Sequence, residues 1–134
     1  MASQVLVFRA YHRGKPPKIT VWCSQVFGHE VGKLHHQCTA AERAQFANMH
    51  VLIDRFAMGE QLSQTSFRQE RQGYAFKAGP LRFYGAYSNA HKNSFVLSHA
   101  IIKRHDKLAA ADHDRIVACR QAFDALAGAH AIST

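Results

Sequence analysis

The sequence lacks the features that mark membrane-spanning and disulfide-stabilised proteins. It has no apolar run near the length of about 20 residues that a membrane-spanning helix needs. Its N-terminus, MASQVLVFRAYHRGK, puts positive charge after a short apolar run, which is the reverse of the order in a secretory signal peptide. It has only three cysteines, and these are widely spaced: Cys23, Cys38 and Cys119. That pattern argues against a disulfide framework and predicts a cytoplasmic protein with no membrane partner.

Acidic residues are scarce relative to basic ones. Nine Asp and Glu stand against 17 Lys and Arg, which gives a formal net charge of +8. A small chain this basic often binds a polyanion or an acidic protein. Hydrophobic residues make up 47% of the 134 positions, so the chain can form one core without disulfides or metal. We therefore expect a single domain over residues 1–134.

Apolar periodicity predicts two helices. The first begins near Thr39, which can form a capping box with Glu42, and it ends near Gly59. Its apolar face comprises Phe46, Met49, Leu52, Ile53 and Phe56.

The second predicted helix covers about residues 110–127, and residues 128–134 are predicted to be a flexible tail. Asp112 is its predicted N-cap, with Arg115 at N3. Its apolar stripe comprises Ile116, Phe123 and Leu126.

The remaining apolar segments predict strands. VLVFR (5–9) and ITVWC (19–23) are short and rich in β-branched residues. No clear period follows as far as Cys38, so residues 10–38 are predicted to be an extended loop or hairpin insertion, and 60–73 a short helix or loop. Short connections join 74–78, 81–87 and 94–103 into a predicted antiparallel meander. The order predicts an α+β domain with its helices on one sheet face.

Strand alternation predicts an uncovered sheet face that carries cations. Arg82 and Tyr84 share one face of 81–87, whereas Leu81, Phe83 and Tyr87 share the other. The strand 94–103 then runs directly into a basic cluster that begins Lys103–Arg104. We expect these cations to lie where a phosphate group would bind.

From Thr39 to residue 127 the chain resembles the RelE/ParE superfamily of bacterial type II toxins, in its phage-derived, HigB-like branch. The resemblance rests on Lys77, on Arg82 between apolar neighbours, and on the strand VLSHAIIKR, in which an apolar run and a His precede a basic pair. Residues 5–9 match the family's first strand. The chain departs from the family in its long segment 10–38, in HDKLAAAD after the basic pair, where Lys107 is the matching residue, and in having no Tyr after Tyr87.

The resemblance implies a small antiparallel RelE-like sheet with an N-terminal strand, a long helix packed on one face, a three-stranded meander and a C-terminal helix. It implies a metal-independent endoribonuclease that uses no cofactor and cleaves mRNA at the ribosome. An antitoxin protein would hold it inactive. Two alternatives remain open: a non-enzymatic ParE-like toxin that poisons a topoisomerase, and an inactive phage-related module that binds nucleic acid or protein.

The resemblance and the chemistry of phosphate recognition together suggest roles for individual side chains. Arginine makes bidentate phosphate contacts, and a lysine with a depressed pKa or a histidine can transfer protons. The predicted catalytic residues are Arg82, Lys103, Arg104 and His105. The predicted nucleic-acid-binding residues are Lys77, Arg68, Tyr84 and Lys107, with Tyr84 or Tyr87 stacking on a base.

Two further groups of residues are predicted to be structural. His99 lies mid-strand on the face of Leu97 and Ile101, which predicts a hydrogen-bonded core histidine. Several potential zinc ligands crowd into residues 23–38, but no CxxC or HxxxH unit occurs among them, so no metal site is predicted. These residues are Cys23, His29, His35, His36 and Cys38.

Overall fold

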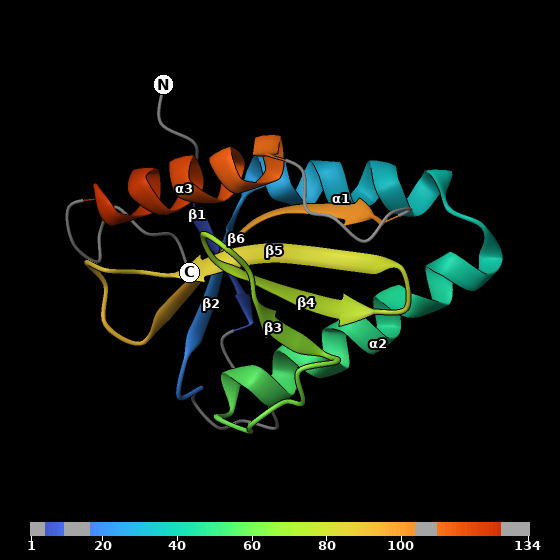
Figure 1. Cartoon of the computed structure of the whole chain (residues 1–134), viewed down its shortest axis with the longest axis horizontal. Helices are drawn as coiled ribbons and strands as arrows, with labels where there is room; N and C mark the ends of the chain where they lie inside the picture. The colour runs from blue at the N-terminus through green and yellow to red at the C-terminus, as the bar shows by residue number, and fades with distance from the viewer. Residues whose placement is uncertain (1–4, 10–16, 104–109, 127–134) are drawn as a thin grey trace.

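The computed structural model describes residues 5–9, 17–103 and 110–126 (Figure 1). Its order of elements confirms the predicted α+β class. The strands are β1 Val5–Arg9, β2 Thr20–Ser24, β3 Phe67–Gln69, β4 Tyr74–Ala78, β5 Leu81–Tyr87 and β6 Ser94–Ile102. The helices are α1 Gln25–Gln37, α2 Ala40–Ala57 and α3 Ala110–Asp124. Within the described ranges, none of these helices is both long and apolar enough to cross a membrane.

The six strands form one mixed sheet in the order β1-β2-β6-β5-β4-β3. The predicted meander is confirmed, because β4, β5 and β6 pair antiparallel in sequence order. The prediction of a wholly antiparallel sheet is wrong, since β2 pairs parallel with β6. The intervening helices carry the chain back across the sheet, and parallel strands require such a crossover. Residues 67–69, predicted to lie in a short helix or loop, add the strand β3 at the edge.

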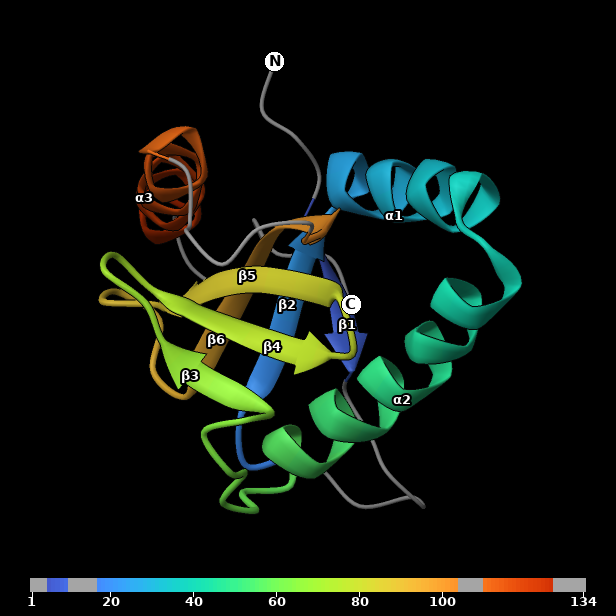
Figure 2. The same cartoon turned by 45° about the vertical axis from the view of Figure 1, so that its right-hand side comes forward.

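Helices cover both faces of the sheet, so the prediction of helices on one face is wrong (Figure 2). One face packs against α1 and α2 around side chains such as Phe27, Phe46 and Phe83. The opposite face packs against α3, where Ile116 contacts the sheet and Phe123 lies against Trp22 with ring centroids 6.0 Å apart. Because the strands carry apolar side chains on both faces, each face needs a cover.

The long helix α2 has the predicted cap and core face. The Glu42 amide donates to Thr39 Oγ1 at 3.2 Å, and the Thr39 amide donates to Glu42 Oε1 at 3.0 Å, which completes the capping box. The predicted stripe packs on the sheet, with Leu52 only partly buried and the other four members fully buried: Phe46, Met49, Ile53 and Phe56.

Helix α1 occupies residues that were predicted to be an extended loop or hairpin. Ser24 caps it by accepting a hydrogen bond from the Phe27 amide at 3.1 Å. Its core contacts recur at helical spacing through Phe27, Val31 and Leu34. The exposed glycines at 28 and 32 lower helix propensity and obscured this short apolar stripe.

The N-cap prediction for the last helix is wrong. Helix α3 begins at Ala110, so Asp112 lies inside its first turn. The Asp112 carboxylate instead accepts a hydrogen bond from the ring of His99 on the sheet. The predicted stripe is confirmed, since Ile116 and Phe123 are buried and Leu126 packs against the cluster that contains Phe123.

A β-bulge interrupts the pairing of β5 with β6 at Ser98. Tyr84 pairs with His99 and Gly85 pairs with Leu97, which leaves Ser98 as the extra residue of β6. A bulge re-aims the side chains that follow it. Leu97 therefore packs toward α1 and α2, whereas His99 turns toward α3. The prediction that His99 shares a face with Leu97 is wrong for this reason.

Candidate nucleic-acid interface

Basic side chains on, or directly after, four neighbouring strands gather near one end of the sheet. Lys77 of β4 and Arg82 of β5 are direct cross-strand partners. Lys103 follows β6, and its amide donates to the Pro80 carbonyl at 2.7 Å, beside the β4–β5 turn. Arg68 of the edge strand β3 is exposed, and the other three are partly exposed. The structure thus brings together four of the predicted site residues, a group we call the cationic cluster: Arg68, Lys77, Arg82 and Lys103.

The alternation of side chains places the centre of this cluster on the α3 side of the sheet. Ala75 and Tyr84 are paired and lie beneath α3. Lys77 and Arg82 lie two residues further along their strands and so point to the same side. The cluster is therefore adjacent to the area that α3 covers, on a sheet face that remains partly open to solvent.

The electrostatics of Lys77 reflect this crowding. Burial lowers the pKa of its ammonium group, and the neighbouring charges of Arg82, Arg68 and Lys103 lower it further. The carboxylate of Glu70 acts in the opposite direction. The lowered pKa means that the neutral amine of Lys77 forms more readily than that of an isolated lysine. From the sequence, Lys77 is predicted to bind nucleic acid and is not among the predicted catalytic residues.

Arg82 is held by backbone carbonyl groups. Its Nη1 donates to the carbonyl oxygen of Gly79 at 2.5 Å and to that of Leu81 at 3.1 Å. Its Nε is buried without a hydrogen-bond partner in the described part of the chain. These bonds fix the plane of the guanidinium above the β4–β5 turn, and neither of them neutralises its positive charge.

The prediction that Tyr84 stands on an open face is wrong. Helix α3 covers Tyr84, and only 1% of the residue's surface is exposed. The centroid of its ring lies 5.0 Å from that of the His99 ring. Burial raises the pKa of its hydroxyl to about 12, with a smaller contribution from Asp112. A ring enclosed in this way has no face on which an RNA base can stack. Tyr87 is more exposed, but its ring packs edge-on against Phe95 at 5.2 Å on the opposite face.

His99 is a satisfied core histidine, as predicted. It is fully buried, with Nδ1 lying 2.8 Å from Ser98 Oγ and Nε2 lying 2.8 Å from Asp112 Oδ1. Burial lowers the pKa of its imidazole, whereas the hydrogen bond that its ring donates to Asp112 raises the pKa and the charge of Arg115 lowers it. These partners could not be predicted from sequence pattern, because Ser98 and His99 would lie on opposite faces of a regular strand.

Arg104, His105 and Lys107 lie outside the described residues, so their predicted roles stay predictions. The Cys and His side chains of residues 23–38 do not gather at one place in the fold. Cys23 and Cys38 are buried in the core, whereas the three histidines are exposed on α1: His29, His35 and His36. Across the described ranges, no three His, Cys, Asp or Glu side chains are grouped so as to hold a metal ion.

Comparison with known proteins finds no family model that matches this chain and no match among curated proteins. The resemblance to the RelE/ParE superfamily therefore rests on the residues and strand pattern described above.

Proposed function

We propose that this protein is a RelE/ParE-like toxin that cleaves mRNA at the ribosome without a metal or cofactor. The observation that carries the proposal is the pairing of Lys77 with Arg82 inside a cluster of four cations. A clustered basic face is the electrostatic footprint of a nucleic-acid-binding protein. A lysine of lowered pKa beside a fixed guanidinium supplies two of the groups that phosphodiester cleavage needs.

The proposed reaction is attack of a ribose 2′-oxygen on the adjacent phosphorus. Lys77, in its neutral form, accepts the proton of the 2′-hydroxyl as the new P–O bond forms. Arg82 and Lys103 stabilise the additional negative charge on the phosphate oxygens, because charge-assisted hydrogen bonds strengthen as that charge develops. The P–O bond to the 5′-oxygen breaks, giving a cyclic phosphate and a 5′-hydroxyl. His105 is the proposed donor of the leaving-group proton, and Arg104 shares the stabilisation.

Arg68 and Lys107 are the proposed contacts to the RNA backbone outside the cleavage point. An exposed strand arginine binds phosphate at a distance from the reacting atoms and adds salt-dependent affinity. The proposed antitoxin covers the same cationic cluster with an acidic or amphipathic segment, which would block RNA electrostatically and sterically.

A second candidate is a non-enzymatic ParE-like toxin or an inactive binding module. The burial of Tyr84 favours it, because the base-stacking platform expected of an RNA-cleaving site is closed. A shared fold does not determine which activity it carries.

The test is induced expression in a bacterium while mRNA 5′ ends are mapped. We compare wild type with Lys77→Met, Arg82→Ala and the double variant Lys103→Ala/Arg104→Ala. The matched control is Lys33→Ala, which removes an exposed cation from α1 on the other side of the sheet. Growth arrest with new 5′ ends that all three site variants lose, and the control keeps, supports the nuclease. Arrest with intact mRNA and DNA damage signalling supports topoisomerase poisoning, and no arrest supports the inactive module.

A further inference from the structure

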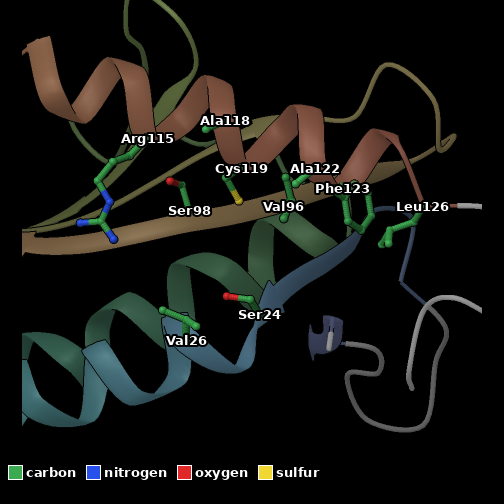
Figure 3. A pocket seen from close by; sticks show the side chains of 10 residues that line it. All are labelled: Ser24, Val26, Val96, Ser98, Arg115, Ala118, Cys119, Ala122, Phe123 and Leu126. Carbon is green, nitrogen blue, oxygen red and sulfur yellow. The ribbon is translucent and has the colours of Figure 1, made fainter. Parts of the chain in front are cut away.

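A groove separate from the cationic cluster runs between α3 and the start of α1, with β6 as its floor (Figure 3). Its volume is about 440 Å³. Most of its wall is apolar, formed by Val26, Val96, Ala118, Ala122, Phe123 and Leu126. Ser98 on β6 faces α3 and lies toward the end of the groove where Arg115 extends from the same helix, whereas Ser24 lies at the start of α1.

Three side chains form a continuous hydrogen-bonded chain that opens into this groove at Ser98. Ser98 Oγ lies 2.8 Å from Nδ1 of His99, and Nε2 of His99 lies 2.8 Å from Oδ1 of Asp112. His99 is fully buried, while Ser98 is partly exposed and lines the groove. The bulge in β6 makes the arrangement possible, because it turns two consecutive side chains toward the same helix.

The donors and acceptors in this chain follow from the chemistry of its members. An ionised carboxylate only accepts hydrogen bonds, so Asp112 requires the proton of His99 to sit on Nε2. The lone pair of Nδ1 is then free to accept the hydrogen of the Ser98 hydroxyl. A serine oxygen bonded to a neutral imidazole that a carboxylate orients is the arrangement of an activated nucleophile.

We propose that Ser98, His99 and Asp112 form a second reactive site, in which Ser98 attacks carboxylic esters whose acyl chain is apolar. Ser98 Oγ forms a bond to the carbonyl carbon while its proton passes to Nδ1 of His99, and the carbonyl electron pair moves onto oxygen. As the tetrahedral adduct collapses, the C–O bond to the alcohol breaks and His99 returns the proton to that alcohol. Water then attacks the acyl-serine by the same proton route, which releases the acid and restores Ser98.

The groove supplies the other groups that this reaction needs. The apolar wall accommodates the acyl chain. Arg115 lines the same groove, and Nη2 donates to both oxygens of Glu30 at 2.6 and 2.8 Å, so the ion pair anchors the guanidinium at one end. Its remaining N–H groups can donate to the oxyanion as charge develops there.

The neighbouring thiol is a poor competitor for the role of nucleophile. Cys119 also lines the groove, and its Sγ lies 3.7 Å from the Leu97 carbonyl oxygen. Burial raises the pKa of this thiol to about 11, while its hydrogen bond with Ser98 and the charge of Arg115 act in the opposite direction. Little of the reactive thiolate is therefore present at neutral pH. Serine reactivity does not require a free anion when a base accepts the proton during attack.

The test uses the full chain and an alkyl fluorophosphonate probe, which transfers its phosphonyl group to an activated serine and releases fluoride. We expect one adduct per chain, located on the peptide that contains Ser98 by mass spectrometry. Ser98→Ala should abolish labelling, and Asp112→Asn should slow it at least tenfold, since the amide can donate to His99 and favour the wrong tautomer. Ser63→Ala, which changes an exposed serine in the α2–β3 connection, should label at the wild-type rate.

Thermal unfolding and circular dichroism of each variant separate a lost reaction from a lost fold. A p-nitrophenyl acyl ester then tests turnover, with faster release expected for a medium-length acyl chain than for acetate. Unlabelled wild type, labelling elsewhere, or equal rates in wild type and a folded Asp112→Asn variant would each overturn the proposal. Because Ser98→Ala leaves the cationic cluster intact, mRNA cleavage by that variant would separate this site from the proposed nuclease.

Discussion

Lys77 and Arg82 lie directly opposite one another on β4 and β5, with their positive charges on the same side of the sheet. Like charges at directly opposed positions destabilise a sheet. A bound polyanion would reverse that effect by neutralising both side chains at once. Removing one of these two charges should therefore weaken anion binding without lowering the free energy of unfolding.

Replacing Lys77 with Gln should weaken RNA binding and leave the fold as stable as before or slightly more stable. The substitution removes one of two opposed cations and about one phosphate contact. The slope of log K against log[salt] for single-stranded RNA should therefore fall by about 0.7. Fluorescence anisotropy titrations at several salt concentrations measure this, with Lys33→Gln as the control on α1. An unchanged slope for Lys77→Gln would mean that RNA does not contact this cluster.

Protonation of His99 should destabilise the fold at acid pH. The polar and charged groups that face it are Ser98 and Tyr84 on the sheet, Asp112 and Arg115 on α3, and Glu30 on α1. Burial is the largest cause of the net lowering of its pKa. Below its ordinary pKa of about 6.5, the unfolded state binds a proton that the folded state resists. The contribution to stability is thus complete above about pH 6.5 and is lost as the pH falls.

Urea unfolding of wild type and His99→Gln between pH 4.5 and 8 checks this prediction. The pH-dependent decline in the free energy of unfolding should be shallower in the variant than in wild type over the acid range. The rest of the sequence is the same in both proteins, so the difference between the two curves isolates His99. Parallel curves would contradict the prediction.

The capping box of α2 should contribute measurably to stability. Thr39→Ala removes the hydroxyl that accepts from the Glu42 amide, and the free energy of unfolding should fall by about 1 kcal/mol. Thr39→Ser keeps the hydroxyl, so it should lower the free energy of unfolding by only a few tenths of that amount. Urea unfolding of both variants provides the measurement, and equal losses would show that the hydrogen bond is not the source.

Replacing either of two glycines with alanine should change the stability of the fold, in opposite directions at the two positions. A Cβ at Gly85 would lie 2.4 Å from the Val96 carbonyl oxygen and 2.5 Å from Phe95 Cε1, so Gly85→Ala should cost about 1–3 kcal/mol through overpacking. A Cβ at Gly28 on α1 would meet no atom within 4 Å. Gly28→Ala should stabilise the protein by up to about 1 kcal/mol, because alanine has the higher helix propensity. Thermal unfolding of the pair gives the measurement, and a shift of the same sign in both would contradict the packing argument.

Local pattern was enough to predict several elements of this protein. The capping box at Thr39 and Glu42 and the apolar stripe of α2 depend on contacts within a few residues, and both were read correctly. The meander followed from strand-like runs joined by short connections. The clustering of Lys77, Arg82 and Lys103 followed from where those residues sit on adjacent strands. Helix α1 was missed although its cap and stripe were present, because two exposed glycines weakened the signal.

Only the tertiary structure decided which part of the sheet stays open to solvent and which side chains meet on each face. The placement of α3 on the second face buried Tyr84, and no local pattern specifies the face on which a distant helix packs. The bulge at Ser98 reversed the side-chain alternation of β6, and it depends on pairing between strands rather than on sequence within one strand. By itself the sequence determined α2, α3, the meander strands and the excess of positive charge. The hydrogen-bonded chain of Ser98, His99 and Asp112 exists only because pairing and helix packing bring residues of β6 and α3 into contact.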